Sequence, residues 1–179
     1  MSSLRAQVCS SLLIAAMAGF GSEASAQHGP AGGGFWFGAD GAYGRMARTN
    51  CASCESAGIG FGSIRLGGRI SSRMLLGAEV GIAGGSSELP SPALAVLLGT
   101  VSLYPLAASG AHLRLGFGAL GRGTYWNVDG MALVALMAGA GYDVRVSSGM
   151  SVVPSISWIV APGGYSTNVL RAGVGITFH

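Results

Sequence analysis

The chain has 179 residues, of which half are hydrophobic and only 9% are charged, against about 25% in ordinary soluble domains. It contains 32 glycines and no lysine, and its net charge of +3 is too weak and too scattered to favour a nucleic-acid partner. After the N-terminal region, no stretch reaches the length of a membrane helix without a polar interruption. A closed β-barrel, the other structure that can cross a bilayer, therefore fits this composition better than a soluble domain.

The N-terminal region has the order of segments that is typical of a secretory signal peptide. Arg5 is the only charge before an apolar run from Val8 to Phe20, which is shorter than the roughly 20 residues that a spanning helix needs. Ala24-Ser25-Ala26 then offers small residues for cleavage. The sequence predicts a signal peptide at residues 1–26 and one exported domain at residues 27–179. The alternative is that the run forms a buried core helix.

Alternation with a period of two residues dominates the rest of the chain, as expected of β-strands with one apolar face. In the segment from Met74 to Ala83, the side chains predicted to face lipid are Met74, Leu76, Ala78, Val80 and Ile82. Those predicted to face a tight polar lumen are Leu75, Gly77, Glu79 and Gly81. The pattern predicts a strand of a transmembrane barrel.

Eight segments of this kind can be counted, and most are close to the 9–11 residues of a tilted membrane strand. They are Gly34–Gly44, Ile59–Ile70, Met74–Ala83, Ala93–Tyr104, Ala111–Leu120, Met131–Arg145, Ser151–Val160 and Asn168–Phe178. The face assignment is ambiguous at 93–98, which is apolar on both faces, and at 151–153. The predicted fold class is all-β, a single antiparallel up-and-down transmembrane β-barrel of eight strands.

The connections between these segments alternate in length, which supports the barrel. The longer ones are Arg45–Gly58, Gly84–Pro92, Gly121–Gly130 and Ala161–Thr167, and the shorter ones are Ser71–Arg73, Pro105–Gly110 and Val146–Met150. Outer-membrane barrels have long extracellular loops and short periplasmic turns. The sequence therefore predicts that both ends of the chain lie in the periplasm.

Two cysteines, Cys51 and Cys54, follow the predicted cleavage site and fall in the first long connection. In an exported protein such a pair meets an oxidising compartment, so a small loop disulfide is the favoured interpretation. Free thiols, or a redox or metal site, remain as alternatives, although no second cysteine pair is present and the histidines lie far away in sequence.

The chain resembles the small outer-membrane barrels of the OmpA/OmpX type. The resemblance is carried by the first-strand pattern FWFGADGAYG, the strand–turn–strand unit LGGRISSRMLLGAEVG, the YPL after the fourth segment and the closing GVGITF. It implies an integral outer-membrane protein in contact with lipid and lipopolysaccharide. It also implies that Phe178 is the outward C-terminal aromatic which the barrel assembly machinery recognises. His179, which follows this aromatic, departs from the pattern.

Charged side chains are few on the faces predicted to point inward. They are Asp40, Arg65, Arg69, Glu79, Arg114, Asp143, Arg145 and Arg171. An isolated buried ion is costly, so these groups are expected to pair. We predict a lumen charge cluster of Arg65, Arg69, Glu79 and Arg114, in which the turn after Ser71 brings Glu79 against Arg65. The cluster either fills the lumen structurally or forms a selectivity constriction, and an eight-stranded barrel leaves little room for the second.

Catalytic, cofactor and metal sites are not predicted. His112 lies on an inward face; no serine follows it at close spacing, and Ser102 on the preceding segment could in principle approach it as a nucleophile. Trp36, Tyr104, Trp126 and Trp158 fall near expected segment ends, where aromatic residues gather at the bilayer interfaces.

Three functions from different classes remain open. The favoured one is an outer-membrane barrel with a filled lumen and a structural or surface-interaction role. The alternatives are a narrow conduit for small or apolar solutes and, least favoured, an enzyme that modifies envelope lipid. The partner of the extracellular loops is not identified by the sequence.

Overall fold

The computed structural model describes residues 34–49, 56–85, 93–106, 109–123, 133–162 and 166–179. The strands in these ranges are β1 (Phe35–Arg48), β2 (Ser56–Ser71), β3 (Met74–Gly85), β4 (Ala93–Leu103), β5 (Ala111–Gly123), β6 (Leu133–Tyr142), β7 (Val144–Ser147), β8 (Met150–Ala161) and β9 (Thr167–Phe178). No helix in the described part of the chain has the length and hydropathy to cross a membrane.

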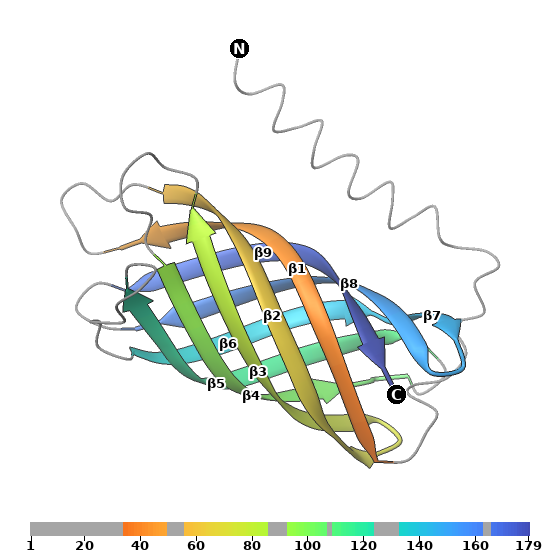
Figure 1. Cartoon of the computed structure of the whole chain (residues 1–179). Helices are drawn as coiled ribbons and strands as arrows, with labels where there is room; N and C mark the ends of the chain where they lie inside the picture. Colours follow the sequence, from red (N-terminus) through yellow and green to blue (C-terminus); the bar gives the residue numbers. More distant parts are fainter. Residues whose placement is uncertain (1–33, 50–55, 86–92, 107–108, 124–132, 163–165) are drawn as a thin grey trace.

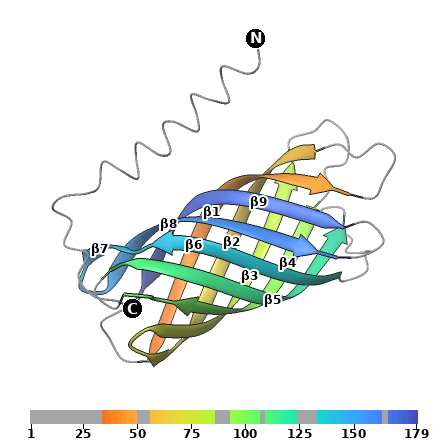
Figure 2. The ribbon, with the colours of Figure 1, turned by 180° about the vertical axis from the view of Figure 1, so that it is seen from behind.

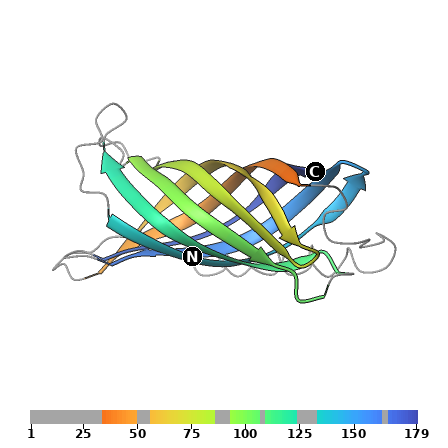
Figure 3. The same cartoon turned by 90° about the horizontal axis from the view of Figure 1, so that it is seen from below.

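The strands form one closed antiparallel sheet. The sheet order is β6-β5-β4-β3-β2-β1-β9-β8-β7, and pairing between β6 and β8 closes it. Figures 1 and 2 show the strands tilted around the barrel from opposite sides, and Figure 3 shows the same closure from below. Because β6 and β7 occupy one strand position, the barrel has eight positions, and the predicted eight-stranded up-and-down barrel is confirmed.

The segment predicted as one strand at Met131–Arg145 is interrupted at Asp143. The register from Gly141↔Ser155 to Val144↔Val152 is continuous, which places Tyr142 opposite Pro154. Proline has no N–H group and removes a hydrogen bond from the ladder at this point. The N–H of Asp143 points the other way and donates to the carbonyl of Gly110 at 2.9 Å.

The faces predicted for the segment Met74–Ala83 are correct. In β3, Leu76, Val80 and Ile82 are exposed on the outer face, whereas Leu75 and Glu79 are buried inside. The ambiguous segment at the start of β4 is also resolved: Leu94, Val96 and Leu98 point inward and Leu97 points outward. Ser151 and Val153 of β8 both lie inside.

The two ends of the barrel differ in their connections. At one end, the turn end, are Ser72–Arg73 between β2 and β3, residues 104–106 and 109–110 between β4 and β5, and Ser148–Gly149 between β7 and β8. The other end, the loop end, carries the four connections after β1, β3, β5 and β8. The first of these is shorter than predicted, because β1 continues to Arg48 and β2 already begins at Ser56.

Several sequence predictions lie outside the described residues. These are the signal peptide at residues 1–26, the cysteines Cys51 and Cys54, and Trp126.

Candidate functional site in the lumen

The lumen near the loop end is apolar, which corrects the prediction that the inward faces line a tight polar lumen. Buried side chains from eight strands pack together there: Met46, Ile59, Phe61, Ala83, Leu94, Val96, Leu98, Leu120, Ala135, Met137, Ile159, Ala161 and Val169. We call this set the apolar half. The apolar half explains why β4 is apolar on both faces at its start. One face belongs to the apolar outer surface of the barrel, and the other packs in this core.

The lumen between the apolar half and the turn end is ionic, and Glu79 of β3 lies at its centre with no exposed surface. Arg171 of β9 donates from Nη2 to Glu79 Oε1 at 2.5 Å and from Nε to the hydroxyl of Ser157 at 2.7 Å. Its guanidinium also lies 4.1 Å from the ring centroid of Phe61, at the edge of the apolar half. Glu79 and Arg171 therefore join two strands that are not neighbours in the sheet.

Arg65 has a different partner from the one predicted. Arg65 and Glu79 face each other in the β2–β3 register, but Arg65 Nη2 donates to Asp40 Oδ1 of β1 at 2.7 Å. The hydroxyl of Ser63 donates to the other Asp40 oxygen at 3.1 Å. The β2–β3 register places Glu79 next to Arg65, but Arg65 forms its ion pair with Asp40 of β1, the strand on the other side of β2.

Arg114 of β5 completes the central group, which we call the ionic layer: Asp40, Arg65, Glu79, Arg114 and Arg171. Its Nη1 atom lies 3.9 Å from Glu79 Oε2, too far for a hydrogen bond, and both atoms are buried without a hydrogen-bond partner. The lumen also contains a cavity of about 10 Å³ lined by Asp40, Ala42, Ser63, Arg114, Ser155, Ser157, Arg171 and Gly173. A cavity of this size holds about one water molecule.

At the turn end of the lumen, Trp36, Leu75 and Tyr104 pack together in a buried cluster. The prediction that Trp36 and Tyr104 sit at a membrane interface is wrong, because both side chains point inward and are only 5% and 4% exposed. Trp36 lies over Gly67 and Gly77, where a Cβ atom at Gly77 would come within 2.7 Å of the Trp36 ring. The two glycines make room for the indole.

Tyr104 is held by Asp143, the residue at the break between β6 and β7. The Tyr104 hydroxyl donates to Asp143 Oδ2 at 2.6 Å, and His112 Nδ1 lies 3.3 Å from the same oxygen. Burial and the neighbouring Asp143 carboxylate raise the pKa of the Tyr104 phenol well above its usual value, so the phenol keeps its proton. The arrangement ties β4, β5 and β6 together at the turn end.

His112 is occupied by this structural group. It contacts Asp143, and its ring lies 5.2 Å from that of Tyr104. No hydrogen bond joins it to Ser102 among the described residues, although Ser102 also points inward. In the same residues, no group of three or more His, Cys, Asp and Glu side chains is placed to hold a metal ion.

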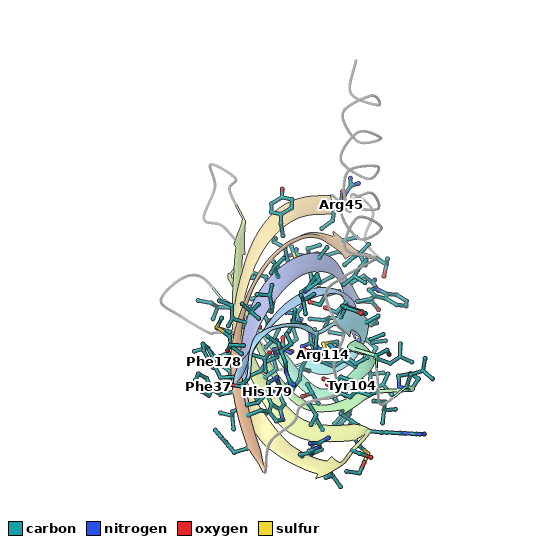
Figure 4. All side chains as sticks on the ribbon, turned by 90° about the vertical axis from the view of Figure 1, so that its right-hand side faces the viewer. Phe37, Arg45, Tyr104, Arg114, Phe178 and His179 are labelled. Atoms are coloured by element: carbon teal, nitrogen blue, oxygen red, sulfur yellow. The ribbon has the colours of Figure 1, made fainter. Side chains whose placement is uncertain are left out.

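The other predicted residues lie outside the ionic layer. Arg69 is at the β2–β3 turn, where its Nε donates to the Ser71 carbonyl at 3.1 Å. Phe178 points outward, as predicted, and stacks on Phe37 of β1 with the ring centroids 4.7 Å apart. Figure 4 shows this pair on the outer side of the wall, with Arg114 and Tyr104 in the interior. Trp158 is exposed on the outer face of β8.

Sequence reasoning missed how Asp40 and Arg171 pair. Both were among the predicted inward charges, so the alternation signalled their orientation. Their partners come from strands distant in sequence, and the alternation carries no information about those contacts.

Solved structures with the same fold are small outer-membrane barrels. Neisserial surface protein A aligns with a TM-score of 0.60 and 14% identity over 79% of this chain and 95% of that one. The attachment invasion locus protein Ail of Yersinia pestis has a TM-score of 0.55 and 10% identity over 82% and 100%. The outer membrane protein OprG of Pseudomonas aeruginosa has a TM-score of 0.52 and 10% identity over 86% and 99%. No protein-family model matches the sequence, and no curated protein is significantly similar to it.

Proposed function

We propose that this chain is an integral outer-membrane protein with a sealed lumen, which acts through its outer surface and loops rather than as a channel. The observation that supports the proposal is the presence of buried side-chain clusters at three levels of the lumen. The cluster of Trp36, Leu75 and Tyr104 lies at the turn end, the ionic layer occupies the middle, and the apolar half extends toward the loop end.

The outer surface supports a membrane location. Large apolar side chains cover it on every strand position, among them Ile82, Phe117 and Leu136, each more than half exposed. A soluble monomer rarely exposes an apolar surface of this extent, because it would be in contact with water. The predicted signal peptide and the barrel fold agree with the outer membrane, whose phospholipid and lipopolysaccharide would cover this surface.

A conductance measurement tests the sealed lumen. Purified protein in planar lipid bilayers should give no steady single-channel current above background, whereas a porin in the same bilayers should conduct. The gel mobility of the sample before and after boiling should confirm that the barrel is folded. A stable, reproducible conductance from the folded protein would contradict the proposal and favour the alternative of a narrow conduit.

The role proposed for Phe178 in recognition by the assembly machinery has its own test. Phe178→Ala should reduce the fraction of heat-modifiable, folded protein in the membranes of expressing cells, while refolding of purified protein into detergent changes little. Phe117→Ala removes another outward phenylalanine, on β5, and serves as the matched control. Equal folded fractions for the two variants in cells would show that Phe178 has no special role.

The proposal includes no catalytic step. His112 contacts Asp143 and Tyr104, and these three side chains hold the turn end together. Lipid analysis of membranes with and without the protein should show no new lipid species. A new species that is lost in His112→Ala would contradict this part of the proposal.

A further inference from the structure

Arg45 is an unusual charge because it lies on the face of the barrel that is otherwise apolar. Among the strand side chains that the structure describes, it is the only charged one on the outer face. Figure 4 shows it apart from Phe37 and Phe178, the outward pair at the turn end. A charge on this face is unfavourable near the middle of a bilayer and is tolerated near its interfaces. The height of Arg45 on the barrel therefore decides what surrounds it.

The outer face changes from apolar to polar at the level of Arg45. Its neighbour on β9, Leu170, is apolar and 53% exposed. Two residues further toward the loop end, the same face carries Asn168 on β9 and Ser56 on β2. Phe37 lies eight residues back along β1, which is about 20 Å along the barrel axis at the usual strand rise and tilt. Since the apolar band of a membrane barrel is about 25 Å tall, Arg45 lies at the level of the lipid headgroups.

The charge of Arg45 has no counterion on the part of the chain that the structure describes. Its Nε donates to the hydroxyl of Ser56 at 2.8 Å, and none of the ion pairs among the described residues includes it. A guanidinium has five N–H donors, of which this contact uses one. The described side chains therefore leave the positive charge and most of the donors available to an anionic group from outside the protein.

Tyr43 adds a further polar group beside Arg45. It is the preceding outward residue of β1 and is 70% exposed. Its hydroxyl lies over Gly58, the residue opposite Arg45 in β2, so that an added Cβ at Gly58 would clash with it. The guanidinium, the phenol and the hydroxyl of Ser56 thus gather over one stretch of β2. Phosphate oxygens accept hydrogen bonds from such donors, and arginine is well suited to bind them.

The outer wall is flat on the side of Tyr43 that faces the middle of the membrane. Gly41 and Gly62 are opposite each other in the β1–β2 register, and nothing lies within 4 Å of a Cβ added at either position. Val174 and Ile82, which flank this pair on β9 and β3, are both more than half exposed. A hydrocarbon chain can therefore lie directly against the backbone here, below the polar group.

We propose that Arg45, Ser56 and Tyr43 bind a phosphate group of lipid A, the lipid part of lipopolysaccharide, with an acyl chain of that lipid over Gly41 and Gly62. With both chain ends in the periplasm, the loop end faces the cell exterior, where lipopolysaccharide forms the outer leaflet. The site rests on the proposed outer-membrane location, because only there does the loop end meet this lipid. Water would solvate Arg45 but would supply neither the negative charge nor the acyl chain.

Unfolding in mixed micelles tests the site. The folded protein is placed in a neutral detergent with lipid A that carries its two phosphates or with dephosphorylated lipid A, and urea titrations are followed by gel mobility. Phosphorylated lipid A at ten times its dissociation constant should raise the folding equilibrium constant by about tenfold. Dephosphorylated lipid A should have much less effect. Equal effects of the two lipids would overturn the proposal.

Two variants separate the site from general binding of anionic lipid. Arg45→Gln, at an exposed position, should fold and should lose the difference between the two forms of lipid A. Arg73→Gln changes an exposed arginine in the turn between β2 and β3, at the other end of the barrel, and should keep the full difference. An unchanged difference in Arg45→Gln would overturn the proposal.

Phosphatidylglycerol, which carries a phosphate on a different lipid, provides the last control. It should stabilise the parent protein less than phosphorylated lipid A does, and equal stabilisation would overturn the assignment to lipid A. The proposed function fails separately. A folded barrel that gives no channel current but shows no response to the phosphates would refute this site alone, whereas a stable conductance would refute the sealed lumen and leave the lipid site standing.

Discussion

The apolar half and the ionic layer fill the same lumen in different ways. In the apolar half, side chains such as Leu98, Leu120 and Ile159 are completely buried and pack as in the core of a soluble protein. In the ionic layer, Glu79 is equally buried but depends on particular partners, chiefly Arg171. Apolar packing tolerates exchange of one side chain for another of similar volume, whereas a buried ion whose partner is removed is strongly destabilising.

The difference shows that the interior of a barrel of this size can be apolar in one part and ionic in another. The strand alternation directs a side chain inward at every second position in both regions. The stability of an inward side chain then depends on which side chains it contacts from the opposite wall of the barrel. Four predictions test this comparison, from the largest expected effect to the smallest.

Glu79→Ala should have the largest effect, because it leaves Arg171 and Arg114 buried without their carboxylate. We expect a loss of about 3–5 kcal/mol in the free energy of unfolding, measured by urea titration in lipid vesicles. The neighbouring Val80→Ala, on the outer face, is the control and should cost much less. Similar losses in the two variants would mean that water reaches the ionic layer and screens it.

Leu98→Ala tests the apolar half. The side chain has no exposed surface, so its removal should leave a cavity and cost about 2–5 kcal/mol. Leu97→Ala changes the adjacent, outward side chain, which is 58% exposed, and should be milder. Both values come from the same urea titration. If Leu97→Ala were the more damaging variant, the face assignment of β4 would be wrong.

Gly77→Ala tests the closure at the turn end. An added Cβ would lie 2.7 Å from both the Trp36 ring and the Leu66 carbonyl oxygen. Overpacking of this kind costs about 1–3 kcal/mol. At Gly62, where nothing lies within 4 Å of an added Cβ, the same substitution should be nearly neutral. Thermal unfolding monitored by gel mobility compares the two, and equal midpoints would show that Trp36 can move aside.

Tyr104→Phe should have the smallest effect of the four. It removes the hydroxyl that donates to Asp143, but His112 still lies beside the same carboxylate oxygen. We expect a loss of about 1 kcal/mol. Tyr142→Phe, on the outer face, is the control. A loss from Tyr104→Phe as large as that from Glu79→Ala would show that the turn end, rather than the ionic layer, dominates stability.

Much of the fold could be predicted because β-structure leaves a local signature. Side chains in a strand alternate between the two faces, so the orientation of Leu76, Glu79 and Arg171 follows from their positions in short segments. The number of strand positions follows from the number of such segments. The break at Asp143 was not predicted, because Pro154 lies opposite the preceding residue, Tyr142, only once the neighbouring strands are paired.

The candidate site could be predicted only in part. Inward charges were identified correctly, but Arg65 was assigned to Glu79 because the two residues share a hairpin. Trp36 was placed at a membrane interface because aromatic residues at strand ends usually lie there. Its inward position depends on Gly67 and Gly77, which leave space for the indole. That space exists only once β1, β2 and β3 are paired.

The sequence by itself predicted an eight-stranded barrel and, outside the ambiguous segments 93–98 and 151–153, the face on which most strand side chains lie, because both follow from a two-residue period within single strands. Only the tertiary structure decided which charges meet across the lumen. Glu79 and Arg171 are 92 residues apart and belong to strands that are not neighbours in the sheet. Their distance is set by the closure and tilt of the whole barrel, and no local pattern contains that geometry.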